Sequence, residues 1–127
     1  MDIVRVPVSI GELMDKITIL NIKSRMISDE GKLVNIKKEL DFLIETCKEN
    51  KLDCGHEFVG ELESVNEKLW KIEDDIREKE RRKEFDQVFI DLARAVYVTN
   101  DERFVVKSKI NKAFGSAFEE QKSYEEY

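Results

Sequence analysis

The feature that most constrains this sequence is a helical segment, residues 9–27, with apolar residues on two of its faces. One stripe has the three-and-four spacing that aligns side chains along a helix, and it consists of Ile10, Leu13, Met14, Ile17 and Leu20. A second stripe consists of Ile19, Ile22 and Met26, and it leads back towards Asp15 and Glu12. A helix that is apolar on two sides must be covered on two sides. We therefore expect it at the centre of the fold, with both carboxylates near a partly buried end.

The start of this helix is marked by local signals. Ser9 and Glu12 have the spacing of a capping box, in which the Ser hydroxyl accepts a hydrogen bond from the backbone N–H three residues on. The preceding residues 1–8 are rich in β-branched side chains, and Pro7 disfavours helix at the residue before it. We expect a short extended N-terminal arm that either packs along the protein or pairs as a strand with a second chain.

Two further helices follow at short intervals. The second is predicted to begin near Ser28 or Asp29 and to end near Asn50, with Cys47 on its apolar stripe. The third is predicted over about residues 54–82, with Asp53 as its N-cap and a nearly heptad core stripe. Short connections between such helices favour antiparallel neighbours.

A fourth helix should open after Asp86. Thr99 and Glu102 repeat the capping-box spacing inside it, which predicts a break or a kink there. Gly115 is placed to end the helical region, and residues 119–127 are expected to form an acidic mobile tail.

Length and composition limit the fold class. A chain of 127 residues fits one domain, and a sequence with 39% charged residues, one Pro and five Gly favours helices over a many-turned β fold. We therefore predict a single all-α domain: an antiparallel bundle of four main helices, the last of them kinked or split.

Charge and hydropathy argue against several partners. The formal charge of −6 disfavours nucleic acid, which is bound through clustered Lys and Arg. No apolar run reaches the length of a membrane span, and no signal peptide is evident, so a cytoplasmic protein is expected. Cys47, Cys54 and His56 are three possible soft-metal ligands, but a structural zinc site needs four. We predict no metal and no cofactor.

Polar side chains at the edges of the core stripes form the candidate ligand-binding set. These residues are Glu12, Asp15, Trp70, Glu73, Arg77, Arg94, Tyr97, Asn100, Asp101, Arg103 and Lys107. One interpretation is a network of interhelical ion pairs that fixes register. The other is a pocket for a small anionic ligand, with the Arg and Lys residues as its cationic side and Glu73, Asp15 or Tyr97 as general acid or base. Trp70 would be a lid or part of the core.

Known catalytic motifs do not fit the chain. All-α nucleoside triphosphate pyrophosphohydrolases hold magnesium with two pairs of carboxylates, and only Glu12 and Asp15 match half of that pattern. A chorismate-mutase-like fold would need cations aimed at two carboxylates, which Arg77, Arg94 and Lys107 could supply. The sequence has no nucleophile elbow or phosphate-cradling glycine loop. Catalytic residues are therefore not assigned.

Several segments resemble a family of short bacterial all-helical proteins that form a domain of unknown function. The resemblance is carried by residues 6–20, 69–77, 93–103, 110–111, 115–116 and 122–124 together with Lys107. Members of that family are sometimes attached to, or encoded near, glycosyltransferases of surface-polysaccharide assembly. The resemblance implies an accessory role beside such enzymes.

Two hypotheses about function follow. The first is a small interaction or accessory module that binds a protein partner or itself as a homodimer, in cell-envelope carbohydrate synthesis. The alternative is an enzyme or sensor that binds a small anionic metabolite between the helices.

Overall fold

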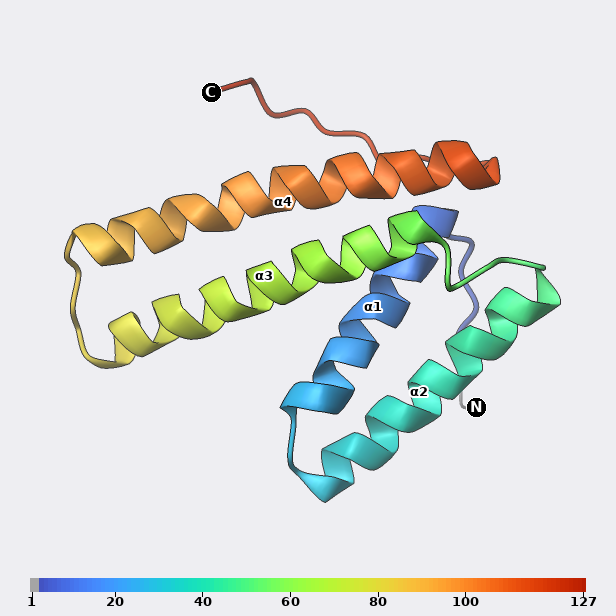
Figure 1. The fold of residues 1–127 in the computed structure, drawn as a ribbon, viewed down its shortest axis with the longest axis horizontal. Coiled ribbons are helices and arrows are strands. Elements are labelled where there is room, and N and C mark those ends of the chain that lie inside the picture. Colours follow the sequence, from blue (N-terminus) through green and yellow to red (C-terminus); the bar gives the residue numbers. More distant parts are fainter. Residues whose placement is uncertain (1–2) are drawn as a thin grey trace.

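The computed structural model describes residues 3–127 and contains four α-helices (Figure 1). They are α1 (Ile10–Met26), α2 (Glu30–Glu49), α3 (Glu57–Arg81) and α4 (Gln87–Phe114), and residues 3–127 contain no strand. The prediction of an all-α helical bundle is confirmed. Residues 3–8 of the predicted N-terminal arm have no regular secondary structure, and Met1 and Asp2 lie outside the described residues.

Three helix starts agree with the local capping signals. The side chains of Ser9 and Asp86 accept hydrogen bonds from the backbone N–H groups of Glu12 and Phe89, at 3.1 and 3.0 Å. Asp29 caps α2 in the same way. Gly115 ends α4 with a φ of 67°, a left-handed conformation that glycine adopts at little cost. These ends were predictable because a cap depends on a few neighbouring residues.

The start of α3 differs from the prediction. His56 is the N-cap, and its Nδ1 accepts a hydrogen bond from the backbone N–H of Phe58 at 3.1 Å. The Asp53 carboxylate instead accepts from the backbone N–H of Gly55 at 2.8 Å, within the preceding turn. The expectation of an Asp53 cap was wrong because this local turn satisfies the carboxylate first.

The predicted break in the last helix is also wrong. α4 is continuous for 28 residues, and Thr99 lies in its middle with 1% of its surface exposed. The Glu102 carboxylate does not cap a helix but pairs with Lys68 of α3 at 3.3 Å. The segment contains no Gly or Pro, and α4 packs along α3, so continuing the helix is favoured over capping a new one.

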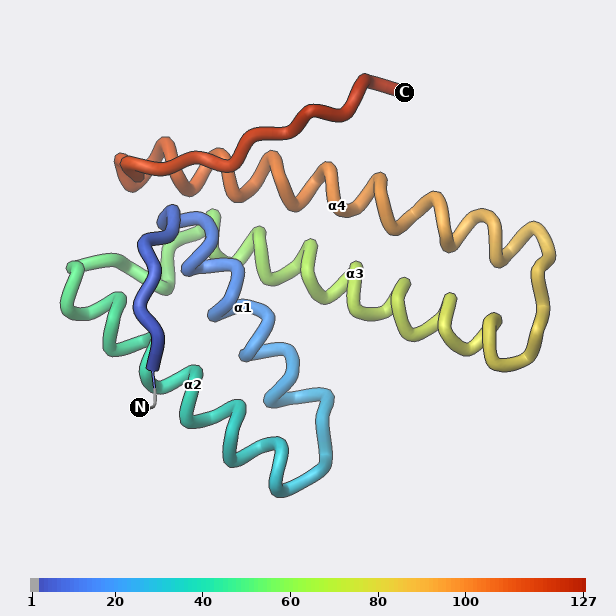
Figure 2. Tube along the Cα trace, turned by 180° about the vertical axis from the view of Figure 1, so that it is seen from behind, coloured from blue at the N-terminus to red at the C-terminus, as the bar shows by residue number. Residues whose placement is uncertain are grey.

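α1 is the central helix of the described chain. It contacts α2, α3 and α4, whereas α2 contacts α1 alone and α3 pairs with α4. The α1–α2 hairpin and the α3–α4 hairpin diverge from one end of the molecule, so that the fold is open on one side (Figures 1 and 2). The apolar core lies at the junction of the hairpins, around Met14, Ile17, Leu62 and Ile110. The central position predicted for this helix is confirmed.

Burial divides α3 and α4 into two parts. No side chain between Asn66 and Thr99 is fully buried, because α1 covers only the part of the α3–α4 hairpin on the other side of these residues. We call residues 69–98 the distal hairpin. Its tip is held by ion pairs of Lys79 with Glu84 and Asp86, at 2.9 and 2.8 Å.

The C-terminal residues 115–127 run back along α4 (Figure 2). Glu120 pairs with Lys107 at 3.1 Å, and the Tyr127 hydroxyl donates a hydrogen bond to Asp101. The mobility of this tail stays a prediction. None of the helices described here is both long enough and apolar enough to cross a membrane.

Candidate functional site

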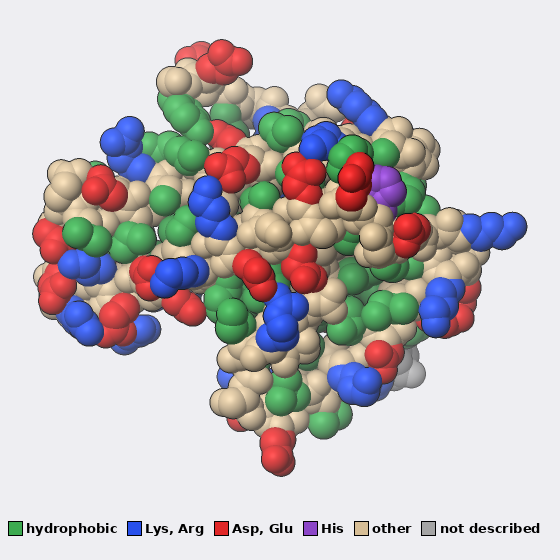
Figure 3. Space-filling view, viewed as in Figure 1, with side chains coloured by type: hydrophobic (Ala, Val, Ile, Leu, Met, Phe, Trp, Pro, Cys, Tyr) green, Lys and Arg blue, Asp and Glu red, His purple; other side chains and the backbone are tan. Residues whose placement is uncertain are grey.

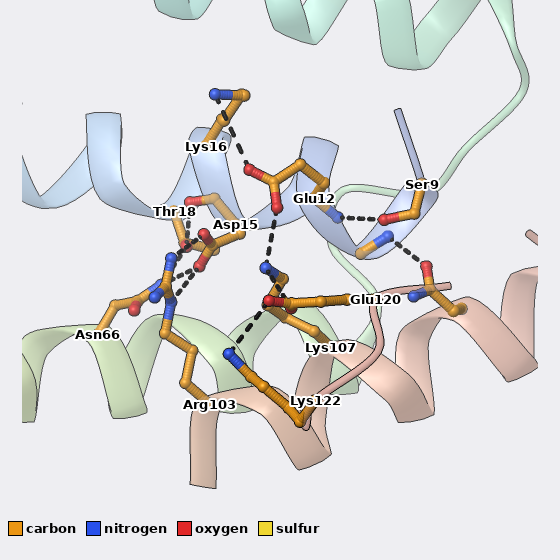
Figure 4. Close-up of polar contacts among 12 residues, drawn as sticks. Ser9, Glu12, Asp15, Lys16, Thr18, Asn66, Arg103, Lys107, Glu120 and Lys122 are labelled. Atoms are coloured by element: carbon orange, nitrogen blue, oxygen red, sulfur yellow. Dashed lines mark hydrogen bonds and ion pairs between the residues drawn. The ribbon is translucent and has the colours of Figure 1, made fainter. Parts of the chain in front are cut away.

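The largest group of buried polar side chains lies where α1, α3 and α4 meet, and we call it the polar junction (Figure 4). Asp15 of α1 is its centre. Arg103 of α4 binds this carboxylate with two nitrogens, the Nε contact being 2.9 Å long. Asn66 of α3 donates from Nδ2 to Asp15 and to the Thr18 hydroxyl, both at 2.9 Å. One carboxylate therefore joins three helices.

These contacts decide the ionisation of Asp15. Burial alone would raise the pKa of this carboxyl, but hydrogen bonds from Arg103 and Asn66 and the charges of Arg103 and Lys107 outweigh burial and lower its pKa below the ordinary value. Asp15 is therefore ionised at neutral pH.

Lys107 forms the second half of the junction. Only 6% of its side chain is exposed, and its ammonium contacts Glu12 at 2.9 Å and Glu120 at 3.1 Å. Burial favours the neutral amine, yet the hydrogen bonds and charges of the two carboxylates prevail and raise the pKa of Lys107. Lys107 therefore keeps its charge, and it ties α1 and the tail to α4.

The C-terminal end of α4 also caps α1. The backbone N–H groups of Ile10 and Gly11 donate to Ser116 Oγ at 3.1 Å and to Asn111 Oδ1 at 2.7 Å. A Cβ on Gly11 would lie 2.7 Å from the carbonyl oxygen of Lys107, which is closer than real contacts allow. Glycine is therefore required here by the approach of α4, and helix donors that usually bond to water or to local side chains are satisfied across the fold.

The ionisable side chains at the centre of the junction are held in their charged forms. A general acid or base works best with a pKa near the operating pH. The pKa of Asp15 is lowered and that of Lys107 is raised, so both move away from neutrality. No buried side-chain N or O atom in the described chain lacks a hydrogen-bond partner. The interpretation as an interhelical network that fixes register fits these residues.

A groove of about 390 Å³ lies beside the junction, in the angle between the two hairpins. Its apolar wall consists of Ile19 and Ile22 from α1 and Leu69 and Trp70 from α3. Its charged wall consists of Glu73, Asp74, Arg77 and Arg103. Figure 3 shows the notch between the hairpins, where hydrophobic and charged side chains alternate on the surface.

The structure distributes the predicted site residues over three places. Glu12, Asp15, Arg103 and Lys107 meet in the polar junction. Trp70, Glu73 and Arg77 line the groove, and Arg103 borders it. Tyr97, Asn100 and Asp101 lie in a hollow between α4 and the tail, which Arg103 also borders. Arg94 is exposed and belongs to none of these. The predicted cationic side of a single pocket, which consists of Arg77, Arg94, Arg103 and Lys107, is therefore not gathered in one place.

Some residues of the junction were not predicted from the sequence. Gly11, Thr18, Asn111 and Ser116 were not among the candidates, although all contribute hydrogen bonds or close packing. The available signals were a glycine inside the first helical turn and asparagines beside apolar stripes. Such signals indicate that another segment packs closely against these residues, but they do not identify the helix that does so.

The two cysteines are free thiols. Burial and the neighbouring Cys54 raise the pKa of Cys47 to about 12, so its thiol stays protonated and unreactive. Within residues 3–127 no three His, Cys, Asp or Glu side chains are grouped to hold a metal ion.

Fold and junction together define an all-helical protein whose central helix is held by partly buried ion pairs. The chain belongs to a family of unknown function, DUF6165, whose model matches residues 4–127. Comparisons with curated proteins and with solved structures gave no match.

Proposed function

We propose that the protein is an interaction module that binds another protein chain through the distal hairpin. The observation that carries this proposal is the burial difference between the two parts of α3 and α4. The junction buries its apolar side chains within the chain, whereas the distal hairpin leaves large ones exposed. Phe85 and Val88 are 56% and 53% exposed, and Ile90, Tyr97 and Val98 are also exposed. Large apolar side chains that one hairpin leaves exposed favour a role in binding another protein.

Catalysis is the weaker explanation of the polar residues. The buried charges are paired and their pKa values move away from neutrality, as described above. A rigid junction instead holds the distal hairpin in a fixed direction from α1. That is what an interaction module requires, because a preorganised surface loses less conformational entropy on binding.

The partner we propose is a glycosyltransferase of surface-polysaccharide assembly, acting in the cytoplasm. Its support is the family resemblance of residues 6–20, 69–77 and 93–103, which implies an accessory role beside such enzymes. Two of these three segments overlap the distal hairpin, which is the surface proposed for binding.

Affinity co-purification from the native cell tests this proposal. We expect a glycosyltransferase to co-purify with the tagged parent chain and to be lost with the double variant Val88→Ser, Ile90→Ser, which removes two of the exposed apolar side chains. Val34→Ser is the matched control, because Val34 is an exposed valine on α2. The same proteins recovered with all three chains would contradict a role for the distal hairpin.

A second candidate function is binding of a small anionic metabolite in the groove. Its volume of about 390 Å³ is in the range of small-molecule sites, and Trp70, Arg77 and Arg103 offer an aromatic wall and two cations. Glu73 and Asp74 on the same wall oppose an anion, which makes this the less favoured function.

A thermal-shift screen with nucleotides, nucleotide sugars and other anionic metabolites separates the two candidates. Metabolite binding requires a rise in melting temperature that Arg77→Ala removes and Arg94→Ala keeps, because Arg94 lies outside the groove. A ligand at a hundred times its Kd should add about 2.7 kcal/mol of stability. With no such shift, the metabolite hypothesis fails and the interaction module stands.

A further inference from the structure

We infer that a second copy of this chain occupies the distal hairpin, so that two hairpins pair antiparallel about a two-fold axis into a four-helix bundle. The inference rests on the proposed function in using the same surface, for which a second copy and the glycosyltransferase would compete. Three observations carry it: an apolar wall of the groove at the base of the hairpin, exposed apolar residues at its tip, and a self-complementary order of charges along the charged wall of the groove.

Groove and tip are complementary in character. The groove at the base has the apolar wall of Ile19, Ile22, Leu69 and Trp70. The tip carries Phe85 and Val88, both more than half exposed. Antiparallel pairing brings the tip of each copy to the base of the other. Phe85 and Val88 of each copy then enter the groove of the other copy. The two tip–groove contacts form together because a two-fold interface is reciprocal.

The charges along α3 in the groove wall have the order that such an interface needs. Glu73 and Asp74 lie about one turn closer to the base than Arg77, and all three line the groove side of α3. In a two-fold interface, residue i of the first copy faces residue j of the second, and residue j of the first copy faces residue i of the second. If the two-fold axis passes between positions 73 and 77, Arg77 of each copy lies opposite Glu73 and Asp74 of the other copy. Parallel pairing would instead place like charges together.

The length of the overlap sets the strength of the dimer. Trp70 and the end of α3 at Arg81 are 11 residues apart, or roughly 16 Å along the helix. Two helices of that length give a small interface, of about 1,000 to 1,200 Å², near the lower limit for a specific complex. We therefore expect a dimer that dissociates at micromolar concentrations rather than an obligate one.

Sedimentation equilibrium of the full chain from 1 to 500 μM tests the pairing. The mass of the parent should rise with concentration from 14.9 kDa towards twice that value. Arg77→Glu should stay monomeric over the whole range, because each copy would then present three acids to the other. Lys71→Glu is the matched control: Lys71 is exposed on α3, pairs with Asp75 as Arg77 pairs with Glu73, and is not among the residues of the groove.

Mixing two charge variants gives the sharper result. Glu73→Arg should also be monomeric alone, because its α3 edge becomes more basic. Equal amounts of Glu73→Arg and Arg77→Glu should form a heterodimer with at least tenfold tighter association than either variant with itself. Loss of folding cannot produce this rescue, and both residues are on the surface.

A parent that stays at 14.9 kDa up to 500 μM overturns the inference, as does a dimer that Arg77→Glu and Lys71→Glu weaken equally. Failure of the proposed function is a separate outcome. If the parent is monomeric but the glycosyltransferase is still lost with the Val88→Ser, Ile90→Ser variant, the hairpin binds a partner other than itself. If the dimer forms and no glycosyltransferase co-purifies, self-association stands and the accessory role fails.

Discussion

The two ends of the α3–α4 hairpin are made of similar residues but are treated differently by the fold. At the junction, α1 covers the hairpin, and Leu62, Asn66 and Ile110 are buried with every polar group paired. In the distal hairpin the same two helices continue with no third helix over them, and Val88 and Ile90 remain exposed. The comparison teaches that α1 fixes one end of the hairpin and leaves the other end uncovered.

Truncation of apolar side chains should give the largest difference in free energy of unfolding between the junction and the distal hairpin. Leu62 is fully buried at the junction, and Leu62→Ala should lower the free energy of unfolding by about 4 kcal/mol, from lost burial and a cavity. Leu92 is only half-buried in the distal hairpin, so Leu92→Ala should cost about 1 kcal/mol. Urea unfolding of dilute protein measures both. Equal losses would remove the distinction between the regions.

The ion pair at the centre of the junction should give the next largest effect. Arg103→Met leaves the buried Asp15 carboxylate without its cation, and we expect a loss of about 3 kcal/mol. Arg94→Met, at an exposed position of the same helix, should change stability by less than about 0.5 kcal/mol. Adding Asp15→Asn to Arg103→Met should recover part of the loss, because the orphaned charge is then absent. A double variant with fully additive losses would show that the pair is not coupled.

Two glycines outside the distal hairpin give opposite expectations, because α4 approaches only one of them. Gly11→Ala should destabilise the protein by about 2 kcal/mol, because the new Cβ meets the Lys107 backbone and forces α4 away from α1. Gly60 is an exposed helical glycine of α3 with open space around it, so Gly60→Ala should stabilise by up to about 1 kcal/mol. Thermal unfolding of both variants gives the sign. Stabilisation by both would refute the close approach.

The smallest expected effect is the pH dependence of the free energy of unfolding at acid pH. The pKa of Asp15 is lower in the folded chain than in the unfolded one, so the unfolded state binds the proton first as pH falls. Its contribution is complete above about pH 3.9 and is lost as pH falls through the folded pKa, with a slope of at most about 1.4 kcal/mol per pH unit. Asp15→Asn should have a flatter profile in this range. An unchanged profile would mean that Asp15 does not titrate as described.

The sequence was sufficient to predict the structural features that depend on residues close together in the chain. The caps at Ser9, Asp29 and Asp86 and the central place of α1 follow from local spacing and from two apolar stripes. Thr99 shows the limit of that reasoning, because its capping pattern is overridden where α4 continues along α3.

The site was less accessible to prediction because it depends on which helices approach. The junction of Glu12, Asp15, Arg103 and Lys107 was within reach as a set of opposite charges at stripe edges. The contact of Gly11 with Asn111 joins residues 100 positions apart, and no local pattern specifies it. The open side of the fold was missed for the same reason, since apolar stripes predict burial without naming what covers them.

Amide hydrogen exchange of the parent chain at low and high protein concentration tests the contrast between the two regions most directly. In dilute protein we expect residues 69–98 to exchange much faster than α1, because few buried contacts protect them. At concentrations that favour the dimer, exchange in residues 69–98 should slow while exchange in α1 stays the same. Equal protection of both regions, unchanged by concentration, would contradict an unpartnered distal hairpin.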